Sequence, residues 1–370
     1  VAGGAEVKVN FFVIFEYFAG MMADDGENGA ISEAEAALYD RQIRLWGLDA
    51  QRRLRASSVL IAGLKGLGAE VAKNIVLSGV KAVTLLDHQQ VTEEDFSSQF
   101  LVSRADLGRN RAEASLERTQ NLNPNVKVTA DPEDVKDKPD EFFTKFSVVC
   151  LTCCSQQTLR RVGHVCHDNG VKFYAGNVHG YCGYMFADLG EHDYVEEKPK
   201  IIKTDKEKEG GKEDGPAAKK AKVDTTETVM VKKTVSYCPW QESQAVDWTS
   251  DSCSKALKKT PQMYFIMKVL LRFREDHDRD PAVSSREEDK VALLRLRDEV
   301  LTEMKLKTDL VGDEFASHCF AALSPVCAVV GGVLAQEIVK AVSGKDAPLN
   351  NFFFFNGIDD SGMVDCIRSS

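Results

Sequence analysis

A glycine-rich turn between two apolar segments is the first feature of the sequence that could do chemistry. Residues 59–62 predict a short strand, and Gly63, Gly66 and Gly68 follow it ahead of a helical pattern. A dinucleotide-binding loop needs a glycine at its middle position too, because the backbone there must approach a phosphate closely. That position is Lys65, whose side chain obstructs the approach. The spacing therefore predicts a nucleotide-type fold with a damaged phosphate site; a purely structural turn is the alternative.

An acidic residue stands where such a fold places its ribose-binding carboxylate. The predicted strand 82–86 ends at Asp87, roughly 20 residues after the turn. The same side chain would also serve as a cap at the end of the strand. The sequence leaves both interpretations open.

Two arginines precede the predicted sheet. Arg41 and Arg44 lie three residues apart on one face of a helical segment, 39–47. One interpretation is a surface helix whose cations pair with acids. The other is an arginine that reaches a polyphosphate on another chain, since a guanidinium donates two parallel hydrogen bonds to phosphate oxygens.

Cysteines cluster at the end of the predicted strand 146–152, but they do not form a metal-binding pattern. Cys150, Cys153 and Cys154 have no second pair at zinc-ligand spacing. A catalytic thiol would need a nearby base, and no local signature accompanies the histidines of the following helix. The ten cysteines predict reduced, buried thiols and no metal site.

The composition is typical of a globular protein with a real core. The chain has 370 residues, of which 43% are hydrophobic and 28% charged. Its net charge of −10 argues against a nucleic-acid partner. The apolar run 11–18 is too short to cross a bilayer, so no membrane partner is expected. Residues 1–30 predict a disordered or spurious N-terminal extension, with a functional anchor as the alternative.

Helices and strands alternate from residue 31 to 197. Ser32 and Glu35 have the spacing of a capping box at the first helix. The alternation predicts an α/β fold with right-handed parallel crossovers. Beyond the elements already named, the expected helices are 109–121, 139–145 and 155–169, and the expected strands are 126–129 and 171–175.

The segment 198–233 interrupts the alternation. Its mixed charge and low apolar content predict a disordered loop. Within it, Lys219, Lys220 and Lys222 match a short basic nuclear-import signal. A solvated charge run is the alternative.

The remaining chain divides into two parts. Residues 234–320 repeat apolar side chains at helical spacing and predict a helical insert. Residues 321–370 return to the α/β domain, with a helix at 325–343 and a buried strand at 350–355.

Six stretches together resemble one known family. They are YDRQIRLWG (39–47), VLIAGLKGLGAEVAKNIVLSGV (59–80), DLGRNRAEAS (106–115), NLNP (121–124), PVCAVVGGVLAQEIVKA (325–341) and NNFFFFNG (350–357). This combination resembles the smaller, regulatory subunits of the SUMO-activating enzymes, which belong to the ubiquitin-activating-enzyme-like adenylation family. The resemblance covers about residues 31–366 and is far more specific than a glycine turn alone.

The resemblance implies a Rossmann-like, ThiF/MoeB-type adenylation fold with a mostly helical insert, in which residues 31–197 form the first part of a pseudo-adenylation domain. It implies a heterodimer in which the larger, catalytic subunit binds ATP and Mg²⁺. That subunit carries the cysteine that accepts SUMO as a thioester. The chain would meet SUMO and the SUMO-conjugating enzyme through this complex, in the nucleus.

Departures from the family agree with a non-catalytic role. Lys65 stands where the functional halves carry glycine, and Arg111 where they carry lysine. Ser97-Ser98-Gln99 precede Phe100, where the functional halves carry Asn-Arg-Gln. No nucleotide-binding residue is therefore assigned in the degenerate loop around Lys65 and Asp87, and this chain alone is expected to be inactive.

Arg41 matches the family's tyrosine-x-arginine-glutamine motif, whose arginine reaches into the opposite subunit's ATP site. The resemblance thus implies a catalytic contribution of Arg41 in trans. Three alternatives remain: a regulatory subunit of a NEDD8-type activating enzyme, a scaffold subunit without active-site contribution, and a stand-alone nucleotide-dependent enzyme such as a dehydrogenase, against which Lys65 argues.

Overall fold

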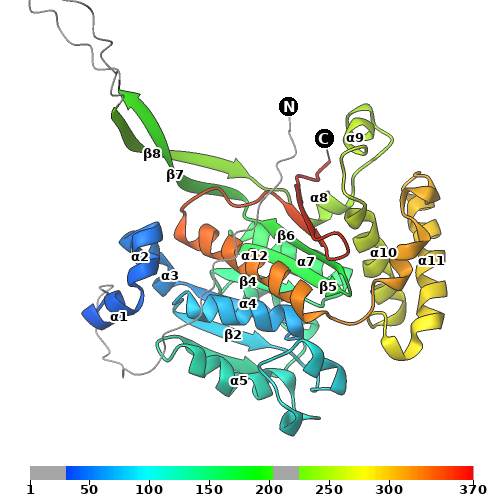
Figure 1. Ribbon diagram of the computed structural model, residues 1–370, viewed down its shortest axis with the longest axis horizontal. Coiled ribbons are helices and arrows are strands. Elements are labelled where there is room, and N and C mark those ends of the chain that lie inside the picture. Colours follow the sequence, from blue (N-terminus) through cyan, green and yellow to red (C-terminus); the bar gives the residue numbers. More distant parts are fainter. Residues whose placement is uncertain (1–30, 203–224, 370) are drawn as a thin grey trace, which may run out of the picture.

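An eight-stranded sheet forms the centre of the molecule (Figure 1), and its strand order is β10-β9-β6-β5-β4-β1-β2-β3. The computed structural model describes residues 31–202 and 225–369. Strands β1 to β5 run parallel, and β6, β9 and β10 continue the sheet antiparallel. Their bounds are β1 Ser58–Ala62, β2 Ala82–Leu86, β3 Lys127–Asp131, β4 Val148–Thr152, β5 Lys172–His179, β6 Cys182–Asp188, β9 Phe352–Asn356 and β10 Ser361–Asp365.

Helices cover both faces of this sheet and give it two hydrophobic cores. Successive strand residues point to opposite faces, so Val59 and Ile61 of β1 join α3, α4 and α12 in one core, while Leu60 joins α7, α10 and α11 in the other. The α/β class predicted from the sequence is confirmed. The helices are α1 Glu33–Leu38, α2 Asp40–Trp46, α3 Leu48–Ala56, α4 Gly66–Leu77, α5 Arg111–Leu122, α6 Asp140–Phe143, α7 Gln156–Asp168, α8 Trp240–Gln244, α9 Asp251–Ala256, α10 Gln262–His277, α11 Arg286–Glu303 and α12 Ser324–Ser343.

The longest helix, α12, lies in the interior. It begins with a proline in its first turn and ends at Gly344 in the left-handed conformation, as helix start and stop rules favour. Among the described residues it alone is long and apolar enough to span a membrane by composition. Its apolar side chains pack against α4 and the sheet, so its hydrophobicity belongs to the core.

A long two-stranded ribbon, β7 (Glu191–Ile202) with β8 (Thr225–Ser236), extends away from the sheet (Figure 1). The prediction of a loop over 198–233 is wrong at both ends, because residues 198–202 and 225–233 are paired strand. Charged residues and threonines outnumber apolar residues there, so these stretches lack a clear strand pattern. The basic residues Lys219, Lys220 and Lys222 lie outside the described residues, as do residues 1–30.

Four strands were absent from the sequence prediction: β6, β7, β8 and β10. Each is antiparallel, so no helix separates it from a neighbour along the chain, and the helix–strand alternation on which the prediction depended does not apply. The helices α8 to α11 occupy the segment between β8 and α12. The capping box at α1 is confirmed, with Glu35 N donating to Ser32 Oγ at 3.2 Å and Ser32 N donating to Glu35 Oε2 at 3.1 Å.

Candidate functional site

The glycine turn joins β1 to α4 at the carboxyl edge of the parallel strands, where α/β folds place their ligands. Gly63 has a φ of +86°, and a Cβ there would lie 2.2 Å from the carbonyl oxygen of Thr152. A Cβ at Gly68 would lie 1.9 Å from the carbonyl oxygen of Gly63. Both glycines are therefore required for β1, β4 and α4 to meet, whether or not a phosphate binds. Gly66 is the first residue of α4.

Asp87, which follows β2, connects the glycine turn to the end of that strand through hydrogen bonds. Its Oδ2 accepts the backbone N–H of Leu64 at 2.8 Å and a guanidinium N–H of Arg111 at 2.9 Å, and its Oδ1 accepts the N–H of Gln89 at 2.9 Å. Both oxygens are thus engaged by the chain itself. Asp87 is also 6% exposed, so the geometry fits a structural carboxylate better than a ribose ligand.

Arg111 lies under the turn in a buried ion-pair network. Its second guanidinium nitrogen donates to Asp95 Oδ2 at 3.1 Å, and the side chains of Arg111, Asp87 and Asp95 are all 5% exposed or less. The guanidinium is the cation that both buried carboxylates share, and without it both would be buried with no counter-charge. This network holds α5, β2 and the glycine turn in one arrangement.

Lys65 reaches out of the turn to a second cluster, which we call the Asp280 cluster: Lys65, His179, Arg274 and Asp280. Lys65 Nζ lies 3.5 Å from Asp280 Oδ2, while His179 Nε2 and Arg274 Nε lie 3.1 and 2.9 Å from Asp280 Oδ1. Arg274 also donates to Asp280 Oδ2 and to the carbonyl oxygen of Cys153. Although burial raises the pKa of Asp280, Arg274 and His179 hold that pKa well below the ordinary value.

The cysteines after β4 have the environment of structural thiols. All ten cysteines are free. Burial raises the pKa of Cys150 to about 12 and raises that of Cys154 further, so neither thiol forms a thiolate readily. Cys153 adopts a φ of +56° and contacts the amide oxygen of Asn177 at 3.4 Å. Within residues 31–202 and 225–369 no group of three or more His, Cys, Asp or Glu side chains could hold a metal ion.

The helices that carry Arg41 are anchored on the body by their other face. The Tyr39 hydroxyl accepts from Asn123 Nδ2 at 2.9 Å, and Gln42 Nε2 donates to the carbonyl oxygen of Leu77 at 3.2 Å. Arg44 forms a 3.0 Å ion pair with Asp40, as the surface interpretation predicts.

Arg41 differs from its neighbour. Its side chain is exposed and makes no hydrogen bond or ion pair with any residue of the described chain. Leu45 lies four residues after Arg41 on the same face of α2 and is 73% exposed. Leu38 and Leu48 in the adjoining helices are 37% and 41% exposed. Figure 1 shows α1 and α2 at one end of the molecule, opposite α10 and α11. The structure thus does not bring Arg41 to the Asp280 cluster.

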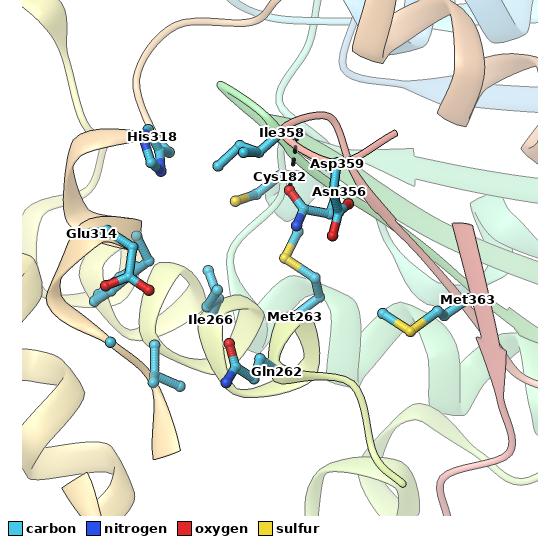
Figure 2. Close-up of a pocket in the computed structure, with 13 residues that line it drawn as sticks. Cys182, Gln262, Met263, Ile266, Glu314, His318, Asn356, Ile358, Asp359 and Met363 are labelled. Carbon is cyan, nitrogen blue, oxygen red and sulfur yellow. Dashed lines mark hydrogen bonds between the residues drawn. The ribbon is translucent and has the colours of Figure 1, made fainter. Parts of the chain in front are cut away.

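A cavity of about 260 Å³ opens farther along the sheet edge (Figure 2). Met263 and Ile266 of α10 lie across it from Cys182 of β6, and the rim carries Glu314 and Asp359. None of the site residues predicted from the sequence lines it.

Sequence reasoning missed the Asp280 cluster. Asp280 is 215 residues from Lys65 along the chain, in a helical segment interpreted only as core. The one available signal was Lys65 itself, because a long cation at a glycine position must find a partner or remain solvated.

Comparison with known proteins places this architecture. The ThiF family profile matches residues 39–368. The chain belongs to the ThiF family. Its relatives include proteins named SUMO-activating enzyme subunit 1: 57% identity for Xenopus tropicalis (93% of this chain, 99% of the relative), 55% for Homo sapiens (94% and 99%) and 56% for Danio rerio (93% and 98%).

The resemblance drawn from the six sequence stretches is thereby confirmed, and so is the adenylation-type fold of the ThiF family. A solved structure, E. coli MccB with succinimide, aligns with a TM-score of 0.50 at 13% identity, covering 90% of this chain and 72% of that one. At that identity the likeness concerns the fold alone.

The buried Arg111 network generates a stability prediction. Replacing Arg111 with Met leaves two carboxylates buried without their cation, and we expect the free energy of unfolding in urea to fall by about 3–5 kcal/mol. The matched control is Arg109→Met, which removes an exposed partner of Asp106 and should change it by less than about 1 kcal/mol. Equal effects of the two substitutions would contradict the structural role of Arg111.

Proposed function

We propose that this chain is the non-catalytic subunit of a heterodimeric SUMO-activating enzyme. The identity to proteins named SUMO-activating enzyme subunit 1, over nearly the whole of each chain, supports the assignment. The glycine turn supports the non-catalytic part, because Lys65 replaces its middle glycine and is paired with Asp280, and both Asp87 oxygens are engaged. ATP and Mg²⁺ are accordingly assigned to the larger, partner subunit.

Arg41 is the observation that carries an active-site contribution. An exposed arginine that has no partner among the described residues, on a helix anchored by Tyr39 and Gln42, is available to an anion on another chain. In the partner's site the SUMO carboxylate attacks the α-phosphate of ATP, and pyrophosphate leaves before SUMO is transferred to the partner's cysteine. The Arg41 guanidinium donates two hydrogen bonds to phosphate oxygens and offsets the negative charge that develops on the leaving group.

The leucines around Arg41 supply the docking contact in this proposal. Leu45 occupies the same face of α2 as Arg41, so a surface that buries Leu45 also fixes the direction of the guanidinium. The complex then presents SUMO to the SUMO-conjugating enzyme. The nuclear location rests only on Lys219, Lys220 and Lys222 and belongs to the proposal.

The direct test is reconstitution. The chain is co-purified with the larger subunit, and thioester formation is measured with SUMO, ubiquitin and NEDD8. We expect a thioester with SUMO only, and none when the chain is incubated alone with ATP and SUMO. Thioester formation with NEDD8 instead would favour the NEDD8-type alternative, and SUMO-adenylate formed by the chain alone would overturn the proposal.

Arg41→Ala tests the contribution in trans. We expect the heterodimer to form normally and ATP–pyrophosphate exchange to slow by about 10²–10³-fold, because one charge-stabilising donor is lost. Arg44→Ala removes the neighbouring arginine, already paired with Asp40, and should leave exchange within about 2-fold. Normal ATP–pyrophosphate exchange in the Arg41 variant would contradict the contribution in trans and favour the alternative of a scaffold subunit without active-site contribution.

Leu45→Ser tests the docking face. Loss of a buried leucine contact should weaken heterodimer affinity by about 10- to 100-fold, measured by titrating one subunit into the other. Val291→Ser is the matched control, since Val291 is 70% exposed on α11 at the opposite end of the molecule. Equal affinity of both variants would show that the partner binds elsewhere.

A further inference from the structure

The Asp280 cluster gathers phosphate-binding groups around a carboxylate. Arg274 contacts both carboxylate oxygens of Asp280. His179 contacts Oδ1, and Lys65 lies near Oδ2. Arginine, lysine and histidine are the side chains that hold phosphate oxygens, and arginine does so through the same two-pronged contact that it makes to a carboxylate.

The Asp280 carboxylate lies beside the glycine turn, where folds of this class bind a phosphate group. Lys65 is the residue immediately before α4, a helix of 12 residues that starts at the glycine turn. A fold of this class binds phosphate at this turn, where helix N–H groups and the helix dipole favour an anion. Asp280 therefore brings negative charge to the strand edge at which a nucleotide would place it.

The loop that presents Asp280 is fixed. It follows α10, which ends at His277 and has Asp278 as its C-cap, with a φ of +52°. The flanking Arg279 donates two 2.7 Å hydrogen bonds to Asp289, which also accepts the backbone N–H of Ala282 at 2.9 Å. Asp280 is thus held in position by the helical insert, 16% exposed.

We propose that Asp280 stands in for a ligand phosphate among Lys65, His179 and Arg274, so that the glycine turn retains an anion site that the chain's own insert closes. The ligand class of the opened site is a phosphate or diphosphate group. This site lies within the present chain, and its existence does not depend on the heterodimer or on Arg41.

Charge explains why the site is closed in the native chain. An incoming phosphate would meet a carboxylate already paired with the same donors, and like charges at that distance repel. Removal of the Asp280 carboxylate takes away the acidic partner of both Lys65 and Arg274. Arg274 then keeps its hydrogen bond to the carbonyl oxygen of Cys153. The nucleoside part of ATP would add little binding free energy, because both Asp87 oxygens already accept hydrogen bonds from the chain.

Calorimetric titration of the full chain with inorganic pyrophosphate tests the proposal. We expect no binding by the native chain and a Kd of about 1 mM or tighter for Asp280→Ala. Adding Lys65→Ala to that variant should weaken binding at least about 10-fold. Asp276→Ala is the matched control, since it removes a carboxylate paired with Arg272 on the same helix, and it should not bind.

ATP and orthophosphate titrations separate the sources of the phosphate group. ATP should bind Asp280→Ala no more tightly than pyrophosphate, and orthophosphate more weakly. A folded Asp280→Ala chain that takes up no pyrophosphate at about 10 mM, or a native chain that binds as tightly as the variant, would overturn the proposal. If Asp280→Ala does not fold, Asp280→Asn keeps the shape and removes the charge: it should bind pyrophosphate weakly, and no binding would overturn the proposal equally.

Discussion

The carboxylate of Asp87 is the contact on which the centre of this molecule depends. It accepts the Leu64 N–H within the glycine turn and the Arg111 guanidinium from α5, so it joins β1, β2 and α5 at one point. Because the three charges of that network are buried together, removal of the Arg111 guanidinium would leave two buried carboxylates without their cation. The conformation of the turn is thereby maintained by contacts within the chain.

The glycine turn and helix α2 are chemically different regions of the molecule. At the glycine turn, cations and carboxylates satisfy one another, and the Asp280 cluster extends that pairing into the helical insert. At α2, Arg41 and Leu45 are left without partners in the described chain. An exposed arginine beside an exposed leucine can gain contacts with another chain, which agrees with the proposal of a subunit that contributes an arginine to another chain's site.

The sequence predicted those parts of the fold that depend on local pattern. The turn at Gly63, the strand ending at Asp87 and the capping box at Ser32 follow from residue type and spacing. The ribbon of β7 and β8 was missed because its charge-rich strands lack a clear strand pattern. The partner of Lys65 was missed because long-range contacts leave no local trace. Likewise, helical spacing alone does not distinguish Arg41 from Arg44. The family motif separates them in the sequence, and the ion pair of Arg44 with Asp40 separates them in the structure.

The position of the helical insert affects how the sheet is completed during synthesis. Strand β6 pairs on one side with β5, its immediate predecessor, but on the other side with β9, which follows α8 to α12. On the ribosome, the nascent sheet therefore keeps one edge of β6 open until nearly the whole polypeptide has emerged. Such late closure favours slow folding and exposes a strand edge to misassembly, so chaperone protection during translation would matter most for this edge.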